Sequence, residues 1–230
     1  TPNASPFARS LVFAFVASWL YEGDAPLAER RLQALSIDRA LLRELLGDDD
    51  MRDLLDPAVL VEVEAELQGV VEGRQARSVD ALHDLLRRVG ALTEAEAAER
   101  YEGDVAPALE ALRAARRAVS ARVGGQRRWI AVEDVSRYRD GLGVVPPGGL
   151  PAVFLGPSRR PLDALLLRYS ATHGPFSAAQ VAARWGLVPA QVTPLLEGLA
   201  AGGRLLHGAF GRDAAWCDED VLRRIKRRTL

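Results

Sequence analysis

Arginine is the residue type whose number and spacing in this sequence point most directly to a chemistry. Arginines recur between residues 113 and 128, and Arg127 and Arg128 stand beside a glycine pair. A guanidinium group donates two parallel hydrogen bonds to one phosphate, so such a pair is suited to holding a phosphate backbone. The candidate ligands of a polyanion are Arg113, Arg116, Arg122, Arg127, Arg128, Arg204 and Arg212. The alternative interpretation is that these side chains only solvate short strands.

Residues for several other chemistries are missing or wrongly spaced. The one lysine, Lys226, is flanked by arginines, whereas the phosphate-binding loop of an ATPase needs a glycine-rich turn that leads to a lysine. His83, His173 and His207 share no metal-ligand spacing with one another or with Cys217. We therefore expect no catalytic residue, no metal and no cofactor in this chain. The histidines and the cysteine are expected to be structural.

A pattern that occurs twice indicates which elements position the arginines. Asp80-Ala81-Leu82 and Asp163-Ala164-Leu165 each open an apolar run, and two more helix-like runs, a basic hairpin, a lone tryptophan and an Asp-Val pair follow in each copy. Three helices and a hairpin make a winged-helix module, a relative of the helix-turn-helix. We predict a mainly α-helical chain with small β-hairpins and two such modules in tandem. Nucleic acid is the first partner that this arrangement suggests.

Composition and charge divide the chain into four predicted parts. These are an acidic helical segment (1–73), winged-helix module 1 (74–141), a linker rich in proline and glycine (142–160), and winged-helix module 2 with a basic C-terminal helix (161–230). The net charge is −8 for residues 1–73, +2 for 74–141 and +5 for 159–230. The positive charge thus lies on the repeated modules, as a polyanionic ligand requires.

Local signals predict the elements of each part. The acidic segment is expected to contain helices over residues 6–21, 26–35 and 38–46 and a fourth that starts at Asp56-Pro57. Module 1 should have helices after Ser78 or Asp80, at the capping box of Thr93 and after Asp104, then strands 119–123 and 129–132 around Gly124-Gly125. Module 2 should have helices 161–172, 177–185 and 189–201, a hairpin over about 203–217 and a helix over 219–229.

Some side chains in these elements are expected to be structural. Trp129 and Trp216 occupy matching strand positions and are predicted to lie in the core. Asp134 and Asp220, from the Asp-Val pairs, are predicted to cap the helices that follow. The uncharged linker is expected to pack along the modules, because a disordered linker would be more polar.

The third helix of module 2 departs from the pattern of a DNA-reading helix. Residues 189–201 include no basic side chain and offer only Gln191 and Thr193 as exposed polar candidates. A helix that enters a groove usually brings cations to the phosphates, so we expect this helix to pack on protein.

The same sequence favours a cytoplasmic location. A single cysteine cannot form an internal disulfide and suits a reducing compartment. The most apolar stretch, residues 11–21, is too short to span a bilayer, so we expect no membrane partner.

Several extended runs resemble bacterial large helicase-related (Lhr) proteins. Residues 5–8, 21–31 and 41–47 resemble the end of the helicase core, in the DEAD/H-associated domain. Ala81-Leu82-His83-Asp84-Leu85-Leu86-Arg87-Arg88 and Gly143-Val144-Val145-Pro146-Pro147 resemble the start of the C-terminal extension, which the run from Trp216 to Leu230 continues.

This resemblance implies an accessory role. Lhr proteins are ATP-dependent superfamily 2 helicases that move 3′ to 5′ along DNA and act in DNA repair. The chain would then be a non-motor, DNA-binding fragment, with single-stranded or tailed duplex DNA and the motor domains of the same polypeptide as partners, and with ATP and magnesium held by those motor domains. The alternative is a scaffold of winged-helix modules that contacts protein or forms a homo-oligomer. A glycosylase module is a weaker third possibility, because no glycosylase motif can be matched here.

Overall fold

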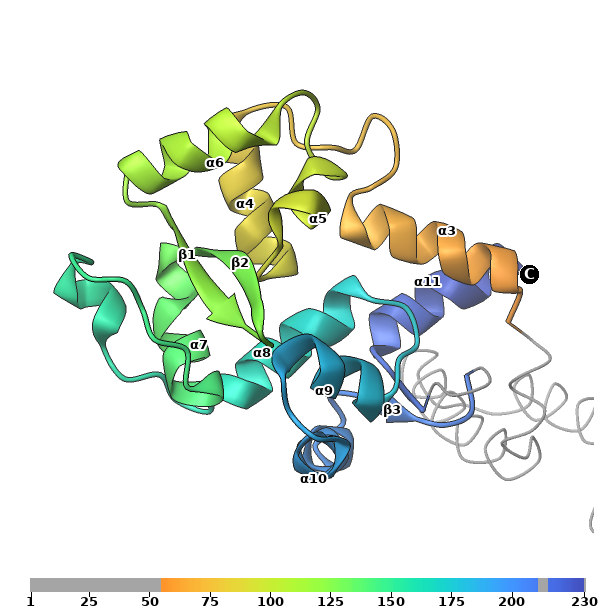
Figure 1. Cartoon of the computed structure of the whole chain (residues 1–230). Coiled ribbons are helices and arrows are strands. Elements are labelled where there is room, and N and C mark those ends of the chain that lie inside the picture. Colours follow the sequence, from red (N-terminus) through yellow and green to blue (C-terminus); the bar gives the residue numbers. More distant parts are fainter. Residues whose placement is uncertain (1–54, 211–214, 230) are drawn as a thin grey trace, which may run out of the picture. The chain divides into compact units, whose positions relative to one another are not determined.

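The computed structural model of the chain describes residues 55–210 and 215–229, which lie in one compact unit formed by residues 52–230 (Figure 1). The helices predicted over residues 6–46 lie outside the described residues. The elements in chain order are α3 (Pro57–Gln68), α4 (Val79–Val89), α5 (Glu94–Ala98), α6 (Val105–Ala114), β1 (Ala118–Val123), β2 (Gln126–Ala131), η1 (Val132–Asp134), α7 (Val135–Leu142), η2 (Ala152–Leu155), α8 (Pro161–Thr172), α9 (Ala178–Trp185), α10 (Pro189–Ala201), β3 (Leu206–His207), β4 (Trp216–Cys217) and α11 (Glu219–Thr229).

Local capping starts the three helices of module 1 where the sequence predicts. The side chains of Ser78 and Asp104 accept hydrogen bonds from backbone N–H groups in the first turns of α4 and α6. Thr93 and Glu96 form both halves of a capping box at α5. These bonds satisfy N–H groups that have no partner within the helix, which fixes each start.

The hairpin of module 1 is longer than the sequence predicts. Its turn glycines, Gly124 and Gly125, have φ of 59° and 77°, as a tight two-residue hairpin turn requires. The ladder therefore begins directly beside the turn, with Val123 opposite Gln126, and β2 starts at Gln126 rather than at Trp129. Trp129 is 8% exposed, which confirms that it is a core residue.

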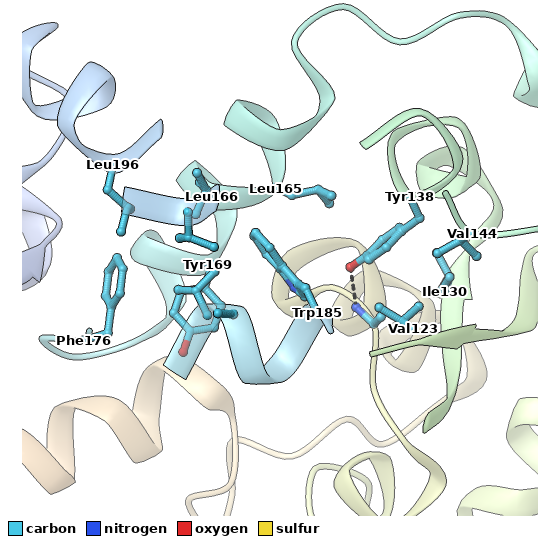
Figure 2. Close-up of a cluster of buried hydrophobic side chains, with 14 of the residues drawn as sticks. Val123, Ile130, Tyr138, Val144, Leu165, Leu166, Tyr169, Phe176, Trp185 and Leu196 are labelled. Atoms are coloured by element: carbon cyan, nitrogen blue, oxygen red, sulfur yellow. Dashed lines mark hydrogen bonds between the residues drawn. The ribbon is translucent and has the colours of Figure 1, made fainter. Parts of the chain in front are cut away.

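The hairpin separates two hydrophobic cores. On one of its faces Ala118, Trp129 and Ala131 pack with α4, α5 and α6 in the core of module 1. On the other face Val119, Ala121, Val123 and Ile130 join residues of α8, α9 and α10 in a core that both modules share (Figure 2). Because successive side chains of a strand point to opposite faces, one hairpin serves both cores. The modules are therefore joined through buried apolar side chains.

The helix after the hairpin also belongs to the shared core. Tyr138 of α7 is 3% exposed, and its hydroxyl accepts a hydrogen bond of 2.8 Å from the backbone N–H of Ala91, drawn as the dashed line in Figure 2. The linker follows the same surface, with Val144 buried and Leu150, Phe154 and Leu155 packed against the core. The expectation that the linker packs along the modules is confirmed.

Module 2 repeats the order of module 1. The described helices α8, α9 and α10 agree with the predicted ranges to within one residue, whereas the hairpin has strands of only two residues. Trp216 is 5% exposed and Cys217 is fully buried, so both are core residues as predicted.

Helix α3 packs on module 2. It begins at Pro57 with Asp56 as its N-cap, as predicted, and Val63 from its apolar face is fully buried. It lies beside α11 and also contacts α8 (Figure 1). Gln68 donates a 2.5 Å hydrogen bond to the carbonyl of Thr172 at the end of α8. This helix of the predicted acidic segment thus shares a compact unit with both modules, and the four domain limits given above stay predictions.

Candidate nucleic-acid interface

The open face of the hairpin carries two arginines opposite each other. Arg122 of β1 is the cross-strand partner of Arg127 of β2, and both are exposed. They lie on the same face as Trp129 but nearer the turn, beyond the helices that cover Trp129. Arg127 donates a 2.8 Å hydrogen bond to the Ser120 hydroxyl. Among the described residues no carboxylate pairs with either guanidinium, so this face has an uncompensated charge of about +2.

Arg128 does not join this pair, which corrects the expectation of two adjacent guanidiniums at the tip of the hairpin. It points to the opposite face of β2 and is 5% exposed. Its Nη1 lies 2.7 Å from Glu96 Oε2, and its Nη2 donates a 2.6 Å hydrogen bond to the side-chain oxygen of Gln126. A phosphate cannot reach a guanidinium that is buried in this way, so we leave Arg128 out of the interface proposed below.

Glu96 forms two ion pairs, one within module 1 and one that joins the two modules. Besides Arg128, it binds Arg184 of α9, whose Nη1 lies 2.9 Å from Oε1. Burial raises the pKa of Glu96, but the hydrogen bond from the Thr93 N–H and the two guanidiniums outweigh this effect. The pKa therefore lies below the ordinary value of 4.5, and Glu96 is ionised in the folded protein.

The tip of the hairpin rests on the turn that connects α9 to α10. A Cβ added to Gly124 would lie 2.3 Å from the carbonyl oxygen of Arg184, and one added to Gly186 would lie 3.0 Å from the Gly124 Cα. Only residues without side chains allow this approach. No pattern in the sequence predicts this contact, although Gly186 is the C-cap residue of α9.

The remaining predicted arginines of module 1 lie at the other end of the hairpin. Arg113, in the last turn of α6, is exposed and forms an ion pair of 2.6 Å with Glu110. Arg116 is exposed in the loop before β1, with a φ of 57°. Because Glu102 and Asp104 precede α6, its N-terminal end is acidic. Helix α6 therefore offers little positive charge to a groove.

Of the two arginines predicted in module 2, one lies within the described residues. Arg204 is exposed just after α10, and Arg212 lies outside the described residues. On α10 itself Gln191 is exposed and Thr193 is partly buried, with its hydroxyl donating to the carbonyl of Pro189. The ring of the exposed His207 lies against Trp216, with ring centroids 4.4 Å apart.

The basic helix α11 is largely compensated by acidic neighbours. Arg228 forms ion pairs of 2.9 and 3.0 Å with Glu66 of α3, which Arg224 also binds. The Arg228 hydrogen bond is the largest cause that holds the pKa of Glu66 below its ordinary value. Arg223 pairs with Glu219 and Asp220 within α11. This helix is thus held to α3, a role that its charge alone did not reveal.

The side chains of the two aspartates of the Asp-Val pairs do not cap helices, so the prediction of capping was wrong, although Asp134 occupies the N-cap position of α7. Asp134 is 3% exposed and binds the guanidinium of Arg168 on α8, with one contact of 2.9 Å, so it joins the modules. Asp220 binds Arg223, while Asp218 accepts the N–H groups of Asp220 and Val221 at the start of α11.

The histidines and the cysteine have structural surroundings. Burial lowers the pKa of His173 to about 4, and its ring stacks on Tyr169 at a centroid distance of 3.6 Å. His83 lies between Glu133 and Arg117. Burial raises the pKa of the Cys217 thiol to about 12, which makes it a poor nucleophile. Within residues 55–210 and 215–229 no group of three acidic, histidine or cysteine side chains could hold a metal ion.

The same described ranges include no helix that is both long and apolar enough to cross a bilayer.

Comparison with known proteins gives related sequences over the whole chain. Residues 53–157 match the family model of the large helicase-related protein winged-helix domain. The whole chain is 46% identical over 234 residues to "Lhr helicase/ probable uracil glycosylase" of Mycolicibacterium smegmatis, and 42% identical over 233 residues to "Lhr helicase/uracil glycosylase" of Escherichia coli. The chain spans 16% and 15% of the length of these two relatives.

Proposed function

Because this chain belongs to the large helicase-related (Lhr) family, we propose that it forms a non-motor, DNA-binding region of an ATP-dependent 3′-to-5′ helicase that acts in DNA repair. Its partners are then DNA, single-stranded or as a tailed duplex, and the motor domains of the same polypeptide in the bacterial cytoplasm. The chain's own residues do not fit an ATP site, since its single lysine, Lys226, lies in the basic helix α11. ATP and magnesium are accordingly assigned to the motor domains.

The observation that carries the proposal is the cross-strand pair of Arg122 and Arg127. Like charges directly opposite each other on a hairpin are destabilising, and no carboxylate among the described residues offsets them. A backbone phosphate placed between two guanidiniums removes this repulsion and accepts bidentate hydrogen bonds from both. Contacts of this kind recognise the backbone and not the base sequence, so we expect binding without strong sequence preference.

The other predicted arginines differ in what they can add to this pair. Arg116 and Arg204 are exposed with no carboxylate partner among the described residues, so each can add one phosphate contact. Arg113 would first have to leave Glu110. Arg212 stays a candidate from its position in the sequence.

A scaffold function is the second candidate, because one observation favours it. The hairpin of module 1 lies between two cores, so a large part of the surface that a free wing would offer to DNA is buried in protein. In this role the modules would hold other parts of the polypeptide, or a second copy of it, at a fixed spacing.

Fluorescence anisotropy of labelled single-stranded and duplex DNA at two salt concentrations tests the proposal. Four phosphate contacts predict a slope of log affinity against log salt of about −3 to −4, and each lost contact reduces its size by about 0.7 to 0.9. The double variant Arg122→Ala/Arg127→Ala should therefore bind more weakly and have a slope smaller by about 1.4 to 1.8.

The matched control is Arg77→Ala/Arg87→Ala, which removes the same charge from exposed arginines that have acidic partners. The control should retain the slope of the wild type. Absence of binding at low salt, together with oligomers in light scattering that both double variants preserve, would contradict the DNA-binding proposal and favour the scaffold.

A further inference from the structure

We propose that the two modules build one composite DNA-binding surface, in which the hairpin of module 1 supplies the phosphate-binding cations for the helix-turn-helix α9–α10 of module 2. This inference rests on the proposed DNA-binding function and specifies where the DNA lies.

Module 2 has the elements of a DNA reader but not the charge. In a helix-turn-helix the second helix reads the groove and its N-terminal residues contact the DNA. In module 2 this helix is α10, and its only charged side chain is Glu197. Val188, Pro189 and Ala190 are exposed at its N-terminal end. The end of α10 that would face DNA is therefore accessible to solvent but carries no basic side chain.

The hairpin of module 1 reaches this position. Gly124 touches the carbonyl of Arg184 and the backbone of Gly186, and α10 starts at Pro189, three residues after Gly186. In Figure 1 the turn between β1 and β2 points at α9, next to α10. The tip of the hairpin therefore lies beside the N-terminal end of α10 without any movement of the modules.

The two arginines stand next to the tip of this hairpin, on the face that is turned away from the shared core. Arg122 precedes Gly124 by two positions and Arg127 follows Gly125 by two. Their neighbours in the strands, Val123 and Arg128, point to the buried face, so Arg122 and Arg127 point to solvent. Glu96, an acidic residue at this junction, is already paired with Arg128 and Arg184 and does not neutralise Arg122 or Arg127.

The two halves of the surface have complementary roles. The guanidiniums provide full charges for the DNA backbone, and the N-terminal end of α10 provides the partial positive charge of a helix dipole. The shared core and the ion pair of Glu96 with Arg184 hold both parts in one geometry, so DNA binding does not have to order them first. Module 2 can then bind DNA although its own helix has no basic residue.

The test adds one negative charge to each candidate helix of the full chain. Ala190→Glu places a carboxylate in the first turn of α10, where it favours the helix, and Ala111→Glu places one at an exposed site of α6. If the surface is composite, Ala190→Glu should weaken binding of a labelled duplex about fivefold, as expected for one charge close to a phosphate, and Ala111→Glu should have little effect. Circular dichroism melting confirms that both variants fold.

The outcomes separate the two proposals. If Arg122→Ala/Arg127→Ala weakens binding and Ala190→Glu does not, DNA binding stands and the composite surface is wrong. If Ala111→Glu weakens binding instead, the hairpin acts with α6 of its own module, which also overturns the inference. If neither the arginine variant nor Ala190→Glu changes binding, the proposed site itself is wrong.

Discussion

Removal of the Glu96 carboxylate should destabilise both modules together. Glu96 pairs with Arg128 at 2.7 Å and with Arg184 at 2.9 Å, and the side chain of Arg128 is only 6% exposed. Removing one partner of a buried pair costs about 3–5 kcal/mol, because the remaining charge stays buried and unpaired. Because Glu96 itself is 28% exposed, we expect a loss near the lower end, about 3 kcal/mol, for Glu96→Ala.

Chemical denaturation of the full chain measures this loss. In a Trp19→Phe background the remaining tryptophans are Trp129 in the core of module 1 and Trp185 and Trp216 in module 2. Their fluorescence and the circular dichroism signal should change in one transition, because the hairpin belongs to both cores. A loss of 3 kcal/mol should also lower the melting temperature by roughly 6–12 °C for a unit of this size.

The control is Glu102→Ala. Glu102 pairs with Arg77 at 2.7 Å, but the two side chains are 59% and 66% exposed, so the loss should stay below about 1 kcal/mol. Equal effects of the two substitutions would show that the buried ion pairs of Glu96, including the one with Arg184 that joins the modules, do not stabilise the fold. Separate transitions for the two modules in the wild type would refute the claim of one shared core.

Two further predictions concern the turn of the hairpin and the pH dependence of stability. Gly125→Ala should cost about 1–2 kcal/mol of the free energy of unfolding, because its backbone is left-handed. Gly124→Ala should cost clearly more, because only a Cβ at position 124 meets the carbonyl of Arg184. Equal melting temperatures of the two variants would contradict this contact. His173 binds a proton in the unfolded chain near its ordinary pKa of 6.5 and in the folded chain only near a pKa of about 4, so acid favours unfolding over this interval. This histidine should therefore lower the free energy of unfolding, measured by urea titration, by about 2 kcal/mol between about pH 7.5 and pH 5. The His173→Gln variant should lack this part of the dependence of stability on pH. An unchanged pH dependence in the variant would show that His173 is not the group that titrates.

Features set by neighbouring residues were predictable from the sequence. The capping box of Thr93 and the N-caps of Asp56 and Asp104 fix helix starts through bonds that span a few residues, so α3, α5 and α6 begin as predicted. The repeated order of helices and hairpin likewise predicted the winged-helix fold.

Features set by distant residues were not predictable. Arg128 is buried because Glu96 lies opposite it, and Asp134 pairs with Arg168 because α7 packs on α8. No pattern along the chain encodes such pairs. One signal was present. Val119, Ala121 and Val123 form an apolar face of β1, and Trp129 of β2 lies on the opposite face of the same hairpin. Apolar side chains on both faces of one hairpin indicate that protein covers both sides.

The position of α3 has a consequence for how further modules can stack. Helix α8 rests on α4 and α7, the first and last helices of module 1, and α3 rests on α8 and α11, the corresponding helices of module 2. Helix α3 therefore packs on module 2 in the same position in which α8, the first helix of module 2, packs on module 1. A third module could not continue the stack with the same step while α3 is seated there. An element that precedes both repeats thus sets where their regular stacking ends, and any module added beyond α11 has to turn onto a new axis.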